Sequence, residues 1–482
     1  MNALFLKRIV QVVPFFLFFI LVNTSFAQHS RHITSAQYVY PTEADVRQKL
    51  EQWRDLKFGM IIHWGLYAVP GIIESWALCS EDWITRDSTI RYDDYKQWYW
   101  GLSKQFNPTQ FDPESWAKAA KNAGMKYVVF TTKHHDGFNL FDTQFSDFKI
   151  TNGPFGTNPK ADVAKHVFEA FRKENFMIGA YFSKPDWHSQ YFWWDLYATP
   201  NRNVNYDIRK FPWRWNKFKE LVSNQINELT SRYGKIDILW LDGGWVRPLH
   251  TVTDEVLSWG APIPEFSQEI DMPSIARRAR SNQPGLLIVD RTVHGPYENY
   301  RTPEQSIPKT KSDTPWESCI TLGNAWGYVP SDQFKSSSKV IHNLIEVVAK
   351  GGSLLLGVGP TAQGTLLPVQ VERLNEIGKW LQANGEAIYG TRTAEHFNDK
   401  EVFFTKGSKH YYALARIPEN QAPTSIISWT GNPPRAGSSV VLISENQPLK
   451  WEKKGEKTVV YLTKELVEKY KNYPALALRL ER

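Results

Sequence analysis

Short apolar runs alternate with amphipathic segments between about residue 50 and residue 390. The runs are rich in Val, Ile and aromatic residues and too short for helices, so they predict strands at residues 59–63, 127–132, 177–182, 236–241, 286–290 and 353–358. Between them, apolar positions recur with a helical period and predict helices at residues 113–124, 162–174, 215–233, 273–279, 338–350 and 371–389. Apolar strands that alternate with helices indicate a parallel sheet covered by those helices.

Polar and aromatic residues stand at the end of nearly every predicted strand. They include His63-Trp64, Lys133-His134-His135-Asp136, Tyr181-Phe182-Ser183, Trp240-Leu241-Asp242 and Asp290-Arg291. A doubly wound dinucleotide-binding sheet would instead place glycines after its first strand, and no G-x-G-x-x-G motif occurs there. Convergence of many strand ends on one site is typical of a (β/α)8 barrel, so the predicted fold class is α/β with a (β/α)8-type, TIM-like barrel.

The pattern changes near residue 391. Short β-rich runs follow at residues 402–405, 411–415, 425–429, 439–443, 458–461 and 475–480, with Gly, Pro and Asn in the turns between them. We therefore predict a catalytic barrel over residues 28–390 and a small C-terminal β-sandwich domain over residues 391–482.

The first 27 residues have the layout of a secretory signal peptide. Lys7 and Arg8 precede an apolar run over residues 9–22, and Ser25-Phe26-Ala27 offers a cleavage site after Ala27. A membrane anchor is the alternative, but the run is short of the roughly 20 residues that a spanning helix needs. The pattern favours export to the periplasm or the extracellular space.

Composition and charge exclude several classes of protein. The chain carries 57 Lys and Arg against 50 Asp and Glu without a basic cluster, so a nucleic-acid partner is unsupported. Cys79 and Cys319 could form a disulfide, but two cysteines make neither a disulfide framework nor a metal-ligand spacing. Aromatic residues make up 14% of the chain, and because their faces stack on sugars, this content mildly favours a carbohydrate protein.

The segment Trp240-Leu241-Asp242-Gly243-Gly244-Trp245 is the sharpest local feature. It places a carboxylate after a buried strand, with two glycines that permit close approach of a ligand and a Trp on either side. An Asp that caps a helix is the alternative, but the Val-Arg-Pro that follows does not begin a helix. We therefore favour a functional Asp242.

The adjacent imidazoles of His134 and His135 can exchange hydrogen bonds with sugar hydroxyls. A zinc site formed by His63, His134, His135 and Asp242 is the rival interpretation. The chain has no H-x-H or H-E-x-x-H spacing, and adjacent residues on a strand point to opposite faces, so no metal is expected.

Glycoside hydrolysis generally needs a second carboxylate, and the loop after Asp290-Arg291 offers two. Glu298 and Glu304 both follow a strand, where catalytic groups of barrels lie. From the residues alone either could be the acid, and both could be ordinary solvated loop residues.

Taken together, these motifs resemble those of the family 29 glycoside hydrolases, the α-L-fucosidases, over about residues 45 to 390. The resemblance rests on the segments Phe58–Gly65, Lys104–Pro108, Lys126–Phe138, Trp240–Asp242, Asp290-Arg291, Thr302-Pro303-Glu304 and Trp326-Gly327-Tyr328, which follow the family order. It implies an exo-acting retaining enzyme that releases L-fucose from fucosylated oligosaccharides or glycoconjugates without a cofactor.

The resemblance also implies roles for individual residues. Asp242 matches the nucleophile and Glu304 the acid/base, and their carboxyl groups should then lie about 5–5.5 Å apart. The positions that match sugar-binding residues of the family are His63, Trp83, His134, His135, Tyr181, Trp240 and Arg291.

The chain departs from the family pattern at two points. The usual Glu-Trp reads Glu81-Asp82-Trp83, and Glu74-Ser75-Trp76 is a competing match. Gly357-Val358-Gly359-Pro360 stands where the family often has Asn-Ile-Gly-Pro. The form Thr-Pro-Glu-Gln weakly resembles members that act on branched α-1,3/1,4-fucosides. A related glycosidase of other sugar specificity, a non-catalytic carbohydrate-binding protein and a metal-dependent hydrolase are the alternatives.

Overall fold

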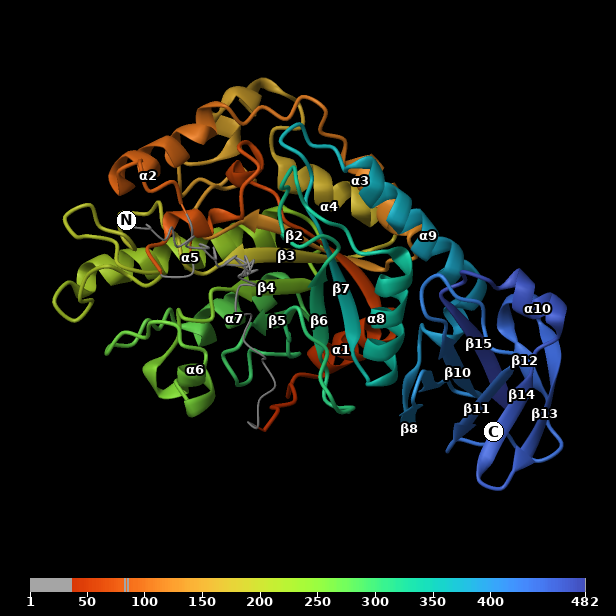
Figure 1. Ribbon diagram of the computed structural model, residues 1–482. Helices are drawn as coiled ribbons and strands as arrows, with labels where there is room; N and C mark the ends of the chain where they lie inside the picture. The colour runs from red at the N-terminus through yellow and green to blue at the C-terminus, as the bar shows by residue number, and fades with distance from the viewer. Residues whose placement is uncertain (1–36, 82–83, 85, 482) are drawn as a thin grey trace, which may run out of the picture.

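The computed structural model describes residues 37–81, 84 and 86–481, which form a barrel domain and a C-terminal β domain (Figure 1). The predicted signal peptide lies outside these residues and stays a prediction. None of the helices in the described ranges combines the length and the apolar character needed to cross a bilayer.

The core of the barrel domain is a parallel sheet, in which the described residues form seven strands in the order β5-β4-β3-β2-β1-β7-β6. The strands are β1 (Phe58–Ile62), β2 (Tyr127–Lys133), β3 (Met177–Ser183), β4 (Ile238–Asp242), β5 (Leu287–Asp290), β6 (Glu317–Thr321) and β7 (Ser353–Val358). Nearly all of their side chains are buried, because helices cover the outside of the sheet and other strand side chains fill its inside. The predicted fold class is confirmed.

An irregular segment, residues 297–305, joins the two edges of the sheet. The Asn299 N–H donates to the Ile288 carbonyl of β5 (2.9 Å), and the Glu317 N–H of β6 donates to the Arg301 carbonyl (2.7 Å). The Cys319 N–H then donates to the Pro303 carbonyl (3.1 Å). The segment therefore occupies the place of an eighth strand and closes the barrel.

Most of the described α-helices of this domain begin with a capping residue or Pro and bury an apolar face. In α4, the Asp162 side chain accepts from the Lys165 N–H, and Val163, Val167 and Phe171 face the core. The α-helices of the domain are α1 (Ala44–Leu56), α2 (Tyr92–Gly101), α3 (Pro113–Asn122), α4 (Val163–Lys173), α5 (Pro212–Arg232), α6 (Asp254–Ser258), α7 (Met272–Asn282), α8 (Ser337–Ala349) and α9 (Pro368–Asn384).

The C-terminal domain is an antiparallel sheet in the order β11-β14-β13-β12-β15-β10-β9-β8, wrapped around a core of its own. Its elements are β8 (Arg392–Asp399), β9 (Val402–Lys406), β10 (His410–Arg416), β11 (Ile426–Thr430), β12 (Val440–Leu442), β13 (Gln447–Lys454), β14 (Lys457–Tyr461), α10 (Lys464–Lys469) and β15 (Ala475–Glu481). The Trp380 indole of α9 donates to the Ala475 carbonyl (2.9 Å) and links the two domains. The predicted limits of residues 28–390 and 391–482 remain a prediction.

The sequence pattern missed elements whose residues are polar. Strand β6 reads Glu-Ser-Cys-Ile-Thr, and β13 carries Lys and Glu on its exposed face, so neither shows a continuous apolar run. Strand β6 is nevertheless fully buried, with Glu317 and Cys319 on the face that lies in the interior of the barrel. Glu317 is thereby placed beneath the site described next, where it accepts a hydrogen bond from Trp240.

Candidate functional site

Two carboxylates meet at one arginine at the carboxyl end of the barrel strands. Arg291, which follows β5, binds Asp242 at the end of β4 (Nη1–Oδ1 2.7 Å) and Glu304 of the closing segment (Nη2–Oε2 2.7 Å). The guanidinium is almost completely buried, whereas the two carboxylates retain 17% and 16% exposure. The exposed fraction of each carboxylate leaves it accessible to a ligand.

Asp242 is held as a carboxylate. Burial opposes its ionisation, but the charge of Arg291 and a hydrogen bond from the Tyr181 hydroxyl (2.8 Å) outweigh burial. The pKa of Asp242 is therefore well below its usual range. Such a group can act as a nucleophile or stabilise a positive charge at neutral pH.

Three imidazoles surround these carboxylates. His63 follows β1, and its ring centroid lies 5.8 Å from that of His134 and 5.4 Å from that of Tyr181. Burial lowers the pKa of His63 to about 3 and that of His134 to about 4, and it also lowers the pKa of His135. Neutral imidazoles can both donate and accept hydrogen bonds, which suits them to sugar hydroxyls.

The expected separation of His134 and His135 to opposite faces is wrong. Strand β2 ends at Lys133, and the backbone turns there, so the two rings lie side by side with centroids 4.2 Å apart. The His134 Nδ1 bonds to the Ser75 hydroxyl, and the His135 Nδ1 bonds to the Ser183 hydroxyl. Both rings therefore face the same site.

The partner of Ser183 identifies the tautomer of His135. The Ser183 hydroxyl donates to the Pro185 carbonyl (2.8 Å), so it must accept from His135, whose Nδ1 then carries the proton. The unprotonated Nε2 lies 3.8 Å from Asp242 Oδ2. It can accept a hydrogen bond from a hydroxyl of a ligand bound at Asp242.

Trp240 and Glu317 support the two carboxylates from inside the barrel. The guanidinium of Arg291 lies 4.4 Å from the centre of the Trp240 ring, which also stacks on Tyr181. The Trp240 indole N–H and the Tyr127 hydroxyl donate to the Glu317 carboxylate (3.1 and 2.7 Å). Burial raises the pKa of Glu317 to about 7.

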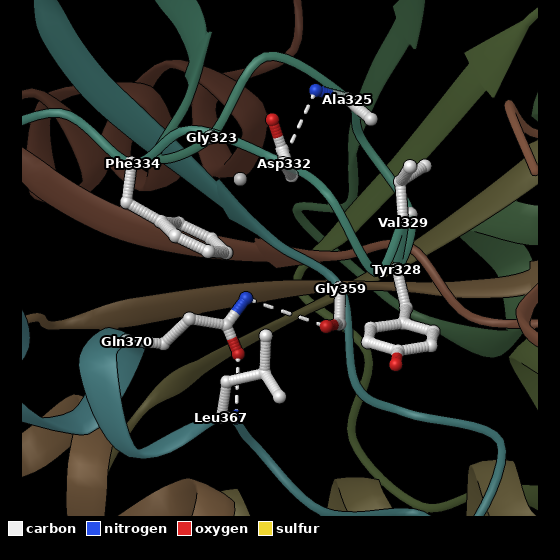
Figure 2. A pocket seen from close by; sticks show the side chains of 11 residues that line it. Gly323, Ala325, Tyr328, Val329, Asp332, Phe334, Gly359, Leu367 and Gln370 are labelled. Atoms are coloured by element: carbon white, nitrogen blue, oxygen red, sulfur yellow. Dashed lines mark hydrogen bonds between the residues drawn. The ribbon is translucent and has the colours of Figure 1, made fainter. Parts of the chain in front are cut away.

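Trp326 contacts Glu304 from the loop after β6. Its indole N–H donates to Glu304 Oε1 (3.2 Å). A small cavity of about 10 Å³ is lined by residues of this loop. Figure 2 shows these residues, among them Asp332, whose carboxylate accepts the Ala325 N–H (3.3 Å). A Cβ on Gly359 would lie 2.4 Å from the Gly327 carbonyl carbon, so glycine is required for the close packing of this loop on β7.

The two glutamates near the expected Glu-Trp motif have different partners. Glu74 is buried and accepts the Gly327 N–H (2.7 Å), whereas Glu81 forms a bidentate pair with Arg202. Trp76 lies at the site, with its ring 5.2 Å from that of His135. Trp83 lies outside the described residues, and its predicted contact with sugar stays a prediction.

Glu298 belongs to a separate cluster. Its carboxylate accepts from His294 Nδ1 (2.7 Å) and from the Thr292 N–H (3.2 Å), and Glu255 approaches the other side of the imidazole (3.5 Å). Burial opposes protonation of His294, but the two glutamates raise its pKa to about 9. The structure thus brings Glu304, and not Glu298, into contact with Arg291 within the described part of the chain.

Comparison with known proteins identifies the family. A profile described as "Alpha-L-fucosidase" matches residues 25–386. The chain belongs to the α-L-fucosidase family. The human tissue alpha-L-fucosidase is 30% identical over 391 residues, which cover 77% of each chain. The alpha-L-fucosidase isoenzyme 1 from Paenibacillus thiaminolyticus is 28% identical with a TM-score of 0.72 (91% of this chain and 99% of that one).

A structure of Thermotoga maritima alpha-fucosidase in complex with fucose is also similar, at 25% identity and a TM-score of 0.70, covering 92% of this chain and all of that one. Members of the α-L-fucosidase family are glycoside hydrolases, so this chain is assigned to the same class of enzyme. Across the residues that the structure describes, His, Cys, Asp and Glu side chains form no group of three or more that could hold a metal ion.

Several residues of this site were missed or left undecided by sequence reasoning. Trp326 was part of the family resemblance without a role, and Trp76 was a competing match. Glu317 gave no signal, because β6 was not recognised. The two cysteines, whose pairing was left open, are both buried free thiols in the described structure.

Proposed function

We propose that this member of the α-L-fucosidase family is an exo-acting retaining enzyme that releases L-fucose from fucosylated oligosaccharides or glycoconjugates. In this proposal Asp242 is the nucleophile and Glu304 the acid/base. The observation that carries it is the binding of both carboxylates to the guanidinium of Arg291, at the end of the barrel where catalytic groups lie. A pair of neighbouring carboxyl groups is what hydrolysis with retention requires.

The first displacement forms a bond between Asp242 Oδ and the anomeric carbon of the fucosyl group. The bond from that carbon to the glycosidic oxygen breaks, and Glu304 transfers a proton to the leaving oxygen. The low pKa of Asp242 supports its role, because the nucleophile must be ionised. The Tyr181 and Arg291 contacts orient the carboxylate for attack.

The second displacement hydrolyses the fucosyl-enzyme. Glu304 accepts a proton from water, the water oxygen bonds to the anomeric carbon, and the bond to Asp242 breaks, so that fucose leaves with its original configuration. His63, His134 and His135 bind the sugar hydroxyls in their neutral forms, and Trp240, Tyr181 and Arg291 complete the pocket. In both displacements the proton is exchanged between Glu304 and either the leaving oxygen or water.

Release of nitrophenol from 4-nitrophenyl α-L-fucoside tests the proposal. Asp242→Asn should lower kcat at least a hundredfold because it removes the nucleophile. Glu304→Gln should do so through the second displacement, because general base catalysis contributes about 10²–10⁴-fold. Glu298→Gln is the matched control and should keep most of the activity, because Glu298 binds His294 and not Arg291. Near-normal turnover by folded Asp242→Asn would refute the nucleophile assignment.

Natural substrates form the second arm of the test. If the wild-type enzyme does not hydrolyse the nitrophenyl fucoside, it should be assayed with fucosylated oligosaccharides, including branched α-1,3/1,4-linked ones. Turnover there would support the proposal and identify the linkage. Fucose binding without turnover on any substrate would favour a non-catalytic carbohydrate-binding protein.

A further inference from the structure

A hollow of about 390 Å³ lies beside the connection from β1 to α3, outside the carboxylate centre. Its apolar lining includes Ile73, Ile90 and Trp98, which are 40%, 45% and 42% exposed. Tyr95 also lines it, with its ring 5.1 Å from that of Trp98. Exposed apolar side chains that gather in a concave surface are typical of a binding site.

The 3-10 helix η2 (Ser75–Leu78) connects this groove with the catalytic centre. Ser75 bonds to His134, and the Trp76 ring lies 5.2 Å from His135. The next residue, Ala77, lines the groove. One short helix therefore presents successive residues to the site and to the groove.

Both features lie at the same end of the barrel. The groove residues follow the carboxyl end of β1, and Asp242 is the last residue of the parallel strand β4. Figure 1 shows α2, which carries Tyr95 and Trp98, on the side of the barrel away from the C-terminal domain. A glycan that places its fucose at Asp242 can thus extend over Trp76 toward the groove.

We propose that the groove binds sugar residues of the glycan that lie beyond the fucose, an inference that rests on the proposed function. The indole ring of Trp98, which is 42% exposed, provides a face on which sugar C–H groups stack, and the buried ring of Tyr95 packs against it. Arg86 is fixed by hydrogen bonds to the Ala77 carbonyl (2.9 Å) and the Cys79 carbonyl, and together with Asp87 it adds polar groups to the lining. Apolar faces with a few fixed polar groups match an oligosaccharide.

Because the groove lies outside the carboxylate centre, only a glycan longer than a simple fucoside can occupy both. The Trp76 ring lies 5.2 Å from that of His135, whose Nε2 is 3.8 Å from Asp242, and none of these three residues lines the groove. We therefore expect a simple fucoside bound at Asp242 to make no contact with the groove. The groove therefore contributes to the hydrolysis of extended glycans and leaves that of small fucosides unaffected.

Kinetics on two substrates test this inference: 4-nitrophenyl α-L-fucoside, and a fucosylated pentasaccharide whose linkage the wild type cleaves. Trp98→Ala should lower kcat/KM for the pentasaccharide on the order of tenfold, mainly through KM, and leave the nitrophenyl fucoside unchanged. Trp213→Ala is the matched control, because Trp213 is 56% exposed on α5 and is not part of the groove lining among the described residues. It should change neither rate.

Ile90→Ser provides a second variant if Trp98→Ala does not fold. An equal effect of these changes on both substrates, or no effect on either, would overturn the inference while leaving the proposed function intact. Inactivity of the wild type on the nitrophenyl fucoside and on every fucosylated oligosaccharide tested would overturn the proposed function and the inference with it. A dimer that is lost in Trp98→Ala, with unchanged kinetics, would assign the groove to self-association and also overturn the inference.

Discussion

Replacement of Arg291 by Met tests whether one buried cation holds the two carboxylates together. Arg291 is 6% exposed and bonds to Asp242 and Glu304 at 2.7 Å each. Met fills much of the same volume but leaves these carboxylates without their counter-charge. Removal of one partner from a buried ion pair costs about 3–5 kcal/mol, so we expect a loss of that size in the free energy of unfolding at pH 7.

The loss should depend on pH in a defined direction. In the wild type the pKa of Asp242 is depressed, so its contribution to stability is present above the unfolded value of about 3.9 and is lost as pH falls through the folded pKa. In Arg291→Met burial acts without the guanidinium and raises that pKa, so the variant loses stability as pH rises above about 3.9. The difference between the two proteins should therefore increase from pH 4 to pH 8.

Urea denaturation followed by tryptophan fluorescence at pH 4, 6 and 8 measures this difference. Arg291→Lys is the matched control, because it keeps the charge but lacks the planar fork that binds both carboxylates. It should lose less stability and show a weaker dependence on pH, yet still lose kcat. A stability difference for Arg291→Met that is the same at pH 4 and pH 8 would refute the electrostatic explanation.

Three further predictions concern the surroundings of the site. Gly359→Ala should lower kcat at least tenfold by displacing the loop that carries Trp326, whereas Gly101→Ala, whose Cβ would meet no described atom within 4 Å, should not. Glu317, whose pKa burial raises to about 7, contributes stability that is present below about pH 4.3 and lost as pH rises through 7, and Glu317→Gln should abolish that decline in urea titrations. His294, whose neighbouring glutamates overcome burial and raise its pKa to about 9, contributes stability that is present below about pH 6.5 and lost as pH rises through 9. His294→Gln should therefore melt below the wild type at pH 6.5 and together with it at pH 10.

The barrel could be predicted because its strands are buried on both faces and its helices are amphipathic. The run Ser353–Val358 was predicted with the bounds that the structure shows, and β2 and β3 differed by one residue. Strand β6 was missed for the opposite reason: it brings Glu317 and Cys319 into the interior, where hydrogen bonds and not apolar character make burial possible. The closing segment, residues 297–305, has no regular ladder that periodicity could detect.

The residues that form the site could be predicted from the sequence better than their arrangement in space. Strand ends pointed to Asp242, His134, His135 and Arg291, because side chains after parallel strands gather at one end of a barrel. Sequence could not reveal that Arg291 joins the carboxylates, since that contact depends on the path of the closing segment. Nor could it decide between Glu298 and Glu304, which lie six positions apart on the same loop but face different partners.

The closing segment explains why Glu304 reaches the site and Glu298 does not. Residues 301–304 pair with β6 in parallel register, so Thr302 and Glu304 lie two positions apart on one face and both contact Arg291 (3.1 and 2.7 Å). Glu298 pairs with β5 in the antiparallel direction, before the segment turns, and its side chain is directed to His294. The same backbone path that closes the barrel therefore selects which glutamate shares Arg291 with Asp242, and barrel closure and the arrangement of the two carboxylates depend on the same hydrogen bonds.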